Sequence, residues 1–437
     1  MKVFHNLREF VRAELPGAPF ARWASIAFTL SVLAFLISLA AAQALLTASA
    51  VCYAVHFWRD RPSVSFPPLK FPLALFCLGT ILSVLWGANP TAGWFAVRKL
   101  VLFVILLLAA NLITSGRHLE WLMKGLFAES ALAALVGATQ FVLQYRVARA
   151  FHPDRIYAFM TSDRITGFMG HWMNFTGQQM LVFGALLAFL LLRTGIRDSG
   201  SGVGEEKTSG RWRSAFWWFA FALVALSIVL GFTRGVWLGC GAAVIYLVAR
   251  RKPRLLWAIP VFALVGYLLA PSMVQRRIQI VTQPRSDPAL AIRFEMWAVA
   301  VEMMKRHPWL GVGPNSIEQQ YVLYLPPGKP PQPGYHAHLH SNFFQLGAER
   351  GLPVLASWVW VMAALVYFIG RLRKGLARRR WVADAALAGW LAFVLEGCFE
   401  FNFGTSPVLM LFLLMMALPF AAARIDRTAG IEPTVDS

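Results

Sequence analysis

The sequence has few charged residues: they make up 14% of its 437 residues, whereas soluble globular proteins carry roughly 25%. Hydrophobic residues reach 58%. No soluble fold has enough interior to bury that much apolar surface, so the surrounding solvent has to be lipid. The shortage of charge therefore excludes an ordinary soluble protein and predicts an all-α protein that crosses a membrane many times.

Cysteine is also scarce. The four cysteines, Cys52, Cys77, Cys240 and Cys398, lie far apart in apolar runs and show no C-x-x-C spacing. Cysteines in such surroundings behave as small hydrophobic residues, so neither a disulfide framework nor a metal site is indicated. The sequence also lacks a D-x-D motif and a P-loop, and we expect neither a metal nor a cofactor.

Apolar runs of about 17 to 25 residues are the sequence signal for membrane spans. We place twelve spans, at 23–41, 44–58, 71–87, 96–113, 121–143, 172–192, 214–231, 234–249, 255–271, 353–370, 382–400 and 404–421. Nine would lie in a first region, residues 1–271. A large, partly helical loop would occupy 272–352, and the last three spans and a tail would occupy 353–437.

Basic residues set the expected orientation. Lys and Arg number 41 against 21 Asp and Glu. Their larger share falls on the side of both chain ends, most densely in RLRKGLARRR at 371–380, which predicts that both termini are cytoplasmic. The positive-inside rule does not explain the basic residues on the outer side, which gather in residues 144–171 and 272–352. We therefore treat them as functional candidates.

The large outer loop carries local helix signals. Asp287-Pro288 resembles a helix start, and the following residues place Ile292, Met296, Val299 and Met303 on one side, as an amphipathic helix at the membrane surface would. A second short helix is expected after Ser341 as N-cap, ending at Gly351. Residues 325–334 contain five prolines and predict an extended strap. The Gly/Ser-rich residues 194–213 are typical of a linker.

Three of the nine histidines, His336, His338 and His340, stand just before that short helix. They could be incidental residues of a polar loop, or metal ligands, or contain a general base. No cysteine or carboxylate lies in the cluster to support a metal. A histidine at a helix N-terminus is kept neutral by the helix dipole, and neutral imidazole can take a proton from a hydroxyl. We favour the general base.

Three arginines of the outer segments are candidates for anion binding. Arg234 lies in GFTRGVWLG where one predicted span ends and the next begins, Arg293 projects from the first loop helix, and Arg164 precedes the sixth span. An arginine at such a place can also be an interfacial residue without a ligand. Three guanidinium groups converging on one cavity would suit phosphate, which they bind in bidentate fashion.

These residues resemble the motifs of the bacterial O-antigen ligases, within the O-antigen ligase/polymerase superfamily of lipid-linked glycan transferases. Arg234-Gly-Val-Trp-Leu238 matches the R-x3-L element of the ligases. His340-Ser341, followed by Gly351, matches a second motif except at its last position, Val354. The stretches from Arg164 to Asn174 and from Arg293 to Asn315 also look like superfamily segments. The resemblance covers nearly the whole chain.

The resemblance implies a GT-C-like glycosyltransferase at the periplasmic face of the inner membrane of a Gram-negative bacterium. It implies metal-independent, inverting transfer of a glycan from undecaprenyl diphosphate to a sugar hydroxyl of lipid A-core, which completes lipopolysaccharide. His340 would be the base, with His338 as the second choice. Arg164, Arg234 and Arg293 would hold the diphosphate and stabilise its charge as it leaves.

Other functions stay open at this point. An O-antigen polymerase would use a second lipid-linked glycan as acceptor, and a protein O-oligosaccharyltransferase would use a protein. A transporter or flippase of a polyprenyl-linked glycan would bind without turnover. That function predicts basic residues in the middle of the spans, but the predicted spans hold almost none, and Glu129 is the clearest ionisable exception. We expect membrane lipid and both lipid-linked substrates as partners, and no nucleic acid. The oligomeric state, a monomer included, is left open.

Overall fold

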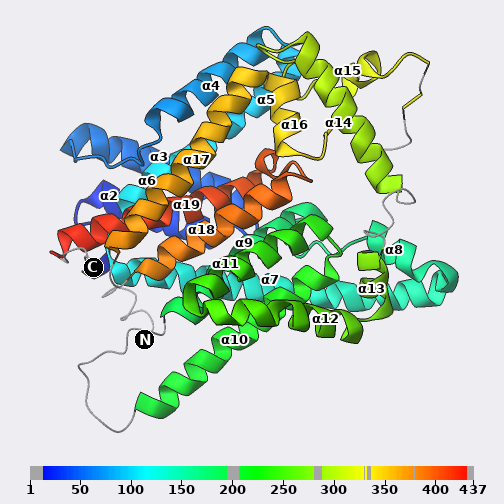
Figure 1. The fold of residues 1–437 in the computed structure, drawn as a ribbon. Coiled ribbons are helices and arrows are strands. Elements are labelled where there is room, and N and C mark those ends of the chain that lie inside the picture. The colour runs from blue at the N-terminus through cyan, green and yellow to red at the C-terminus, as the bar shows by residue number, and fades with distance from the viewer. Residues whose placement is uncertain are drawn as a thin grey trace.

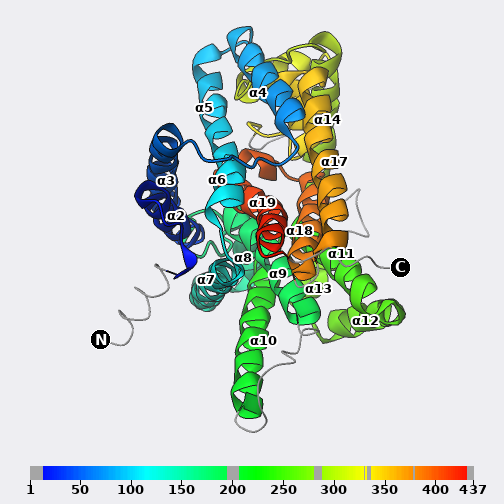
Figure 2. The same cartoon turned by 90° about the vertical axis from the view of Figure 1, so that its left-hand side faces the viewer.

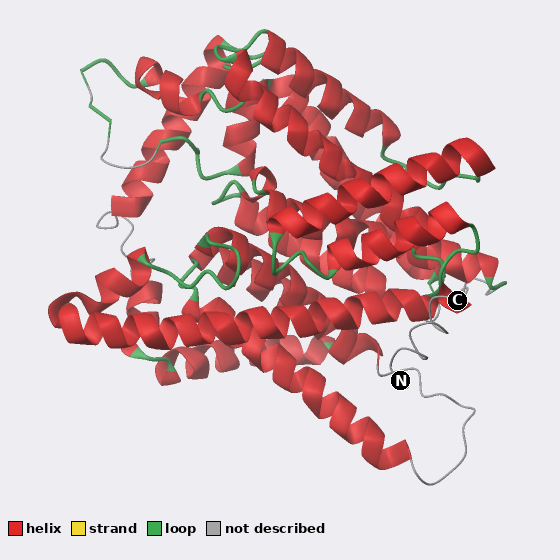
Figure 3. Cartoon of the chain, turned by 180° about the vertical axis from the view of Figure 1, so that it is seen from behind, coloured by secondary structure: helices red, strands yellow, loops and turns green. Residues whose placement is uncertain are grey.

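The computed structural model describes residues 13–193, 206–279, 288–328, 330–331, 336–376 and 379–430. Within these ranges every regular element is a helix, as Figure 3 shows, which confirms the all-α prediction. Six of the helices are long and apolar enough to cross a membrane. The chain is therefore a polytopic membrane protein.

The first half of the chain begins with one short helix, which the long helix α3 follows. In order, the elements are α2 (Pro19–Val32), α3 (Leu39–Asp60), α4 (Lys70–Leu85), α5 (Pro90–Leu100), η1 (Val101–Phe103), α6 (Val104–Leu112), α7 (Gly116–Phe151), η2 (Pro153–Arg155), α8 (Ile156–Ser162) and α9 (Trp172–Leu192). The elements α5, η1 and α6 follow one another without a gap and act as one span, Pro90–Leu112.

The second half contains the shorter outer helices between two groups of long ones. In order, the elements are α10 (Glu206–Leu230), α11 (Arg234–Arg251), η4 (Pro253–Ala258), α12 (Ile259–Leu269), α13 (Ser272–Gln279), α14 (Pro288–Arg306), α15 (Ile317–Gln320), η7 (Tyr321–Tyr324), α16 (Asn342–Arg350), α17 (Leu352–Gly375), α18 (Arg380–Gly397), η8 (Asn402–Gly404) and α19 (Ser406–Thr428).

All twelve predicted apolar runs coincide with helices. Only six of these helices are long and apolar enough to cross a membrane, namely α3, the α5–α6 unit, α7, α9, α17 and α19. Three more are apolar and shorter, namely α4, the apolar part of α10, and η4 with α12. The remaining three are α2, which has 14 residues, and α11 and α18, each of which carries charged residues at its ends.

Two spans differ from the prediction at their ends. The run 23–41 is broken, because α2 ends at Val32 and α3 begins at Leu39. Within the break, the backbone N–H of Leu36 donates to Glu129 Oε1 at 2.9 Å, so a side chain from α7 satisfies a backbone group that the helix no longer pairs. Helix α7 is much longer than the predicted 121–143, because its polar ends continue the helix beyond the apolar stretch.

The main core lies between α9, α18, α19 and α11. Helices α9 and α19 are buried over most of their length, and α18 packs against both α9 and α11. At Gly239 of α11 an added Cβ would lie 2.8 Å from the carbonyl oxygen of Ala392, so this glycine lets α11 approach α18 closely. The core therefore holds α9, α11 and α18 in fixed positions relative to one another.

The segment 194–213 is not all linker. Helix α10 begins at Glu206, because glutamate, lysine and arginine continue a helix outward from an apolar span. The rest of the predicted linker, 194–205, lies outside the described residues, as do Asp287 and most of the second half of the proline strap. The described residues 325–328 and 330–331 are not helical, in line with their prolines.

The large outer loop forms helices whose apolar residues meet in a second core. Met296, Val299 and Met303 of α14 are buried there, with Tyr321 and Leu339 from the segments opposite. The predicted amphipathic side of α14 is therefore confirmed, but it faces protein rather than lipid, since α14 packs on α16 and η7. Helix α16 starts after Ser341 and ends at Gly351, as predicted.

Helices α8, α13, α14 and α15 gather at one end of the molecule (Figure 1). In Figure 1, α8, α13, α14 and α15 lie on the right, whereas the last turn of α19 lies on the left near α2. Figure 2, which views the molecule from that left side, shows the end of α19 facing the reader. The segments that carry the predicted histidines and arginines thus share one end of the bundle.

Candidate active site

His340 lies in the loop immediately before α16 and has a positive φ of 45°. Few non-glycine residues adopt this left-handed conformation, and histidine is among those that do so more often. Its Nδ1 lies 2.8 Å from Oε2 of Glu400, with which it shares a hydrogen bond. Within the described residues, Nε2 of His340 keeps no such partner, and the side chain is 26% exposed. The free nitrogen can meet a substrate.

Glu400 joins this histidine to an arginine. Its other oxygen, Oε1, accepts a hydrogen bond from a terminal guanidinium nitrogen of Arg293 at 2.5 Å, and its side chain is only 4% exposed. Burial by itself would raise the pKa of Glu400. The hydrogen bond with His340 and the charges of Arg293, His340 and Arg164 outweigh it and leave the pKa below its ordinary value. Glu400 is therefore an anion at neutral pH.

The hydrogen bond between the Glu400 carboxylate and Nδ1 determines which nitrogen of the His340 ring is basic. The carboxylate accepts a hydrogen bond from Nδ1–H, so the neutral ring has its lone pair on Nε2. The hydrogen bond with Glu400 thus assigns the tautomer, which the sequence left open. A carboxylate that orients a histidine is the arrangement in which histidine serves as a general base.

Two asparagines fix the loop of His340 against the loop of Glu400. Asn342 Nδ2 donates to Asn402 Oδ1 at 2.6 Å, and the backbone N–H of Phe403 donates to Asn342 Oδ1 at 3.1 Å. On the other side, Trp297 Nε1 of α14 donates to the carbonyl of Leu339 at 3.1 Å. These contacts hold His340 in its left-handed conformation.

Arg164 interacts electrostatically with three other arginines and with Glu400. Burial lowers the pKa of Arg164 to about 10, and the charges of Arg277, Arg293 and Arg234 lower it as well, whereas Glu400 acts in the opposite direction. The other two arginines predicted from the sequence, Arg234 and Arg293, therefore lie within electrostatic reach of Arg164, and Arg277 is a fourth. We call Arg164, Arg234, Arg277 and Arg293 the arginine cluster. Four guanidinium groups gathered at one place suit an anionic ligand.

Each member of the arginine cluster comes from a different element. Arg164 follows α8, donates from Nε to the carbonyl of Thr161 at 2.8 Å and stacks on the ring of Trp172 at 4.0 Å. Arg277 of α13 donates from Nε to the carbonyl of Phe232 at 3.1 Å. Arg234 begins α11, whose next residue, Gly235, packs beside Glu396 and Phe399. The packing of four helix ends thus brings the cluster together.

His338 lies within electrostatic reach of His340 and Glu400. Its pKa is lowered mainly by burial and further by the charges of His340, Lys99 and His171, with Glu400 acting in the opposite direction. Its ring contacts that of Phe401 at 5.7 Å between centroids. His336 points elsewhere, with its ring 4.4 Å from that of Tyr321 in the second core. The predicted trio thus contributes two histidines to the site.

Sequence reasoning missed three residues here: Glu400, Arg277 and His171. Glu400 is the last residue of the predicted span 382–400, and an ionisable residue within a membrane span indicates a functional site. His171 lies in the stretch 164–174, and its pKa is lowered by burial and by Arg164, with Glu400 raising it. Arg277 stands in a polar run without any recognisable pattern. The roles assigned to Arg164, Arg234, Arg293, His338 and His340 stay predictions.

Residues 219–359 match the Wzy_C family, described as O-Antigen ligase. The match includes Arg234, Arg277, Arg293, His338 and His340. Arg164, His171 and Glu400 lie outside it. No curated protein matches the chain. Residues 219–359 of the chain thus form a Wzy_C domain, a domain of the O-antigen ligase/polymerase enzymes that transfer lipid-linked glycans.

Proposed function

We propose that this enzyme is an O-antigen ligase, which transfers a glycan from undecaprenyl diphosphate to a sugar hydroxyl of lipid A-core at the periplasmic face of the inner membrane. The observation that carries the proposal is the pair of His340 and Glu400 beside the arginine cluster. A base for an acceptor hydroxyl and cations for a departing diphosphate are the two requirements of this transfer.

In the proposed reaction, Nε2 of His340 takes the proton of the acceptor hydroxyl. The hydroxyl oxygen attacks the anomeric carbon of the donor sugar and forms the new glycosidic bond. The bond between that carbon and the diphosphate oxygen breaks, and the diphosphate leaves with the electron pair. Attack from the face opposite the leaving group inverts the anomeric carbon. Glu400 stabilises the imidazolium that forms and stays ionised itself.

The arginine cluster stabilises the leaving group. A glycosyl diphosphate gains negative charge on its bridging oxygen as the bond breaks, and guanidinium forks can pair with its phosphate oxygens. Because Arg293 also contacts Glu400, one residue links the base to the leaving-group site. The four guanidinium groups of the arginine cluster can stabilise the charge of the leaving diphosphate, as a metal ion does in other transferases. We therefore propose that the reaction is metal-independent.

The proposal is tested with purified protein, an undecaprenyl-diphosphate-linked glycan and lipid A-core. We expect glycan to appear on the core only when both lipids are present, at a rate that chelator does not change. Lengthening of the glycan on its carrier without core would identify a polymerase instead. Binding of the donor lipid without any product would support the transporter. A rate abolished by chelator and restored by Mg²⁺ would overturn the metal-independent step.

A further inference from the structure

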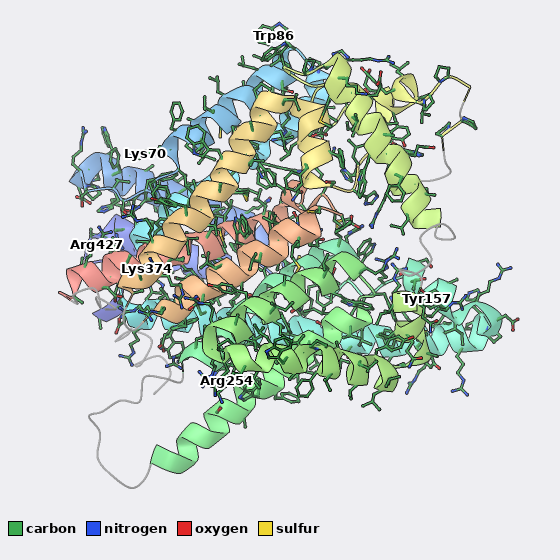
Figure 4. The ribbon with its side chains drawn as sticks, viewed as in Figure 1. Lys70, Trp86, Tyr157, Arg254, Lys374 and Arg427 are labelled. Carbon is green, nitrogen blue, oxygen red and sulfur yellow. The ribbon has the colours of Figure 1, made fainter. Side chains whose placement is uncertain are left out.

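A cavity of about 470 Å³ lies between α17, α19 and the segment before α4. It is at the end of the bundle away from the arginine cluster, because the last turns of α17 and α19 lie on the left in Figure 1. Figure 4 labels Lys374, Arg427 and Lys70 around this end. Apolar side chains form much of the wall, among them Phe66, Phe368, Leu372 and Phe420.

Two arginines, Arg371 and Arg427, line the same cavity and are exposed. A guanidinium group has five N–H donors. Arg371 donates to Tyr367 Oη at 3.2 Å and Arg427 to the carbonyl of Ala423 at 3.3 Å, so each keeps donors for a further partner. The cavity also includes Asp426, which is buried and paired with Arg379. The opening of the cavity is therefore positive.

We propose that this cavity binds an anionic phospholipid of the surrounding bilayer. The phosphate would lie between Arg371 and Arg427, and the acyl chains would follow the apolar wall. Basic pockets between the ends of membrane helices are the sites that suit such head groups. A free phosphate would contact only the two arginines and would leave the apolar wall of the cavity exposed to water. A lipid contacts both the arginines and the apolar wall, so the cavity favours a lipid over free phosphate.

Hydrogen bonds within the protein hold the segments around the cavity in place. The backbone N–H of Ser65 donates to Asn111 Oδ1 at 2.9 Å, and Asn111 Nδ2 donates back to the carbonyl of Ser65 at 2.6 Å. Arg424 in turn donates to the carbonyl of Asn111 at 3.0 Å, which ties α6 to α19. A preformed site loses little conformational entropy on binding. This proposal does not depend on the glycan transfer proposed above.

The test is native mass spectrometry of delipidated protein with phosphatidylglycerol, phosphatidylcholine or soluble glycerophosphoglycerol. We expect wild-type protein to retain phosphatidylglycerol about tenfold better than phosphatidylcholine, and to retain the soluble head group weakly. The double variant Arg371→Gln/Arg427→Gln should lose this preference. The control Lys374→Gln/Arg254→Gln removes two exposed charges that do not line the cavity and should keep it.

Three outcomes would overturn the proposal. They are equal retention of the two lipids by wild-type protein, an unchanged preference in the Arg371/Arg427 variant, and retention of the soluble head group as strong as that of the lipid. Thermal melting of both double variants in phosphatidylcholine checks that they are folded. Because the four side chains are exposed, we expect melting temperatures close to that of the wild type.

Discussion

Glu400 positions both the proposed base and one of the arginines, because its two carboxylate oxygens contact different side chains. One contacts His340 and the other Arg293. A buried carboxylate without partners would be costly, since burial favours its neutral form. Here the surrounding cations and the hydrogen bond keep it ionised. At the scale of the residue, one anion therefore organises both a proposed base and a part of the arginine cluster.

Arg164 allows a test of the arginine cluster by pH. Burial and the neighbouring arginines lower its pKa to about 10, and the same causes would lower the pKa of a lysine placed there from its ordinary value of about 10.4. A lysine would also lose the stacking on Trp172. We expect Arg164→Lys to raise the KM for the donor lipid about tenfold at pH 7.5.

The effect of Arg164→Lys should grow as the pH rises. A cation is lost above its pKa, so the lysine variant should lose donor binding at a lower pH than the wild type. The measurement is KM for the donor lipid between pH 7 and 9.5, with Arg155→Lys, an exposed arginine of η2, as the control. Identical pH profiles for wild type and Arg164→Lys would show that this charge does not bind the donor.

Helix α16 packs closely against the end of α18 at Gly397. At Gly397 an added Cβ would lie 2.2 Å from Asn342 Nδ2, and Asn342 is the residue that ties the loop of His340 to Asn402. A side chain at 397 would push Asn342 away and release both loops. At the scale of the element, a glycine on one helix thus controls the position of a histidine before another.

We expect Gly397→Ala to slow glycan transfer by at least tenfold and to lower the melting temperature. The control is Gly370→Ala on α17, where an added Cβ meets nothing within 4 Å. This control should be neutral or slightly stabilising, since alanine favours a helix over glycine by roughly 1 kcal/mol. Equal transfer rates for the two alanine variants would rule out the positioning argument.

The local elements could be predicted from the sequence, and the long-range ones could not. The start and end of α16 follow from Ser341 and Gly351, and the buried side of α14 from residue spacing. The break after α2 could not be predicted, because it depends on Glu129, 93 positions away from its partner Leu36. The same holds for Glu400, whose partner His340 is 60 positions distant. Hydropathy identifies apolar runs but carries no information on such pairs.

The whole molecule separates its charges by end. The arginine cluster lies with α8, α13 and α14, whereas Lys374 and Arg427 lie at the opposite end (Figures 1 and 4). The bias of basic residues toward the latter end predicts that it is cytoplasmic. The candidate site would then face the periplasm, where a glycan donor and a lipid acceptor can both reach it from the membrane.

Cysteine labelling tests this orientation. The four native cysteines would be replaced by alanine, and a single cysteine introduced at Glu318 or at Thr428, both exposed. In intact cells with a permeable outer membrane, a membrane-impermeant maleimide should label position 318 and not 428. After the inner membrane is opened, both should react. Labelling of 428 alone in intact cells would invert the topology and place the candidate site in the cytoplasm.

The most direct test of the central claim is the transfer rate of His340 and Glu400 variants, measured with purified protein and both lipid substrates. We expect His340→Ala to lose about 10²- to 10⁴-fold in rate, with a smaller loss for His338→Ala. Glu400→Gln should slow the wild type about 10²-fold but the His340→Ala variant less than tenfold, because Glu400 acts mainly through His340. A wild-type rate for His340→Ala, or an equal effect of Glu400→Gln in both backgrounds, would contradict the account.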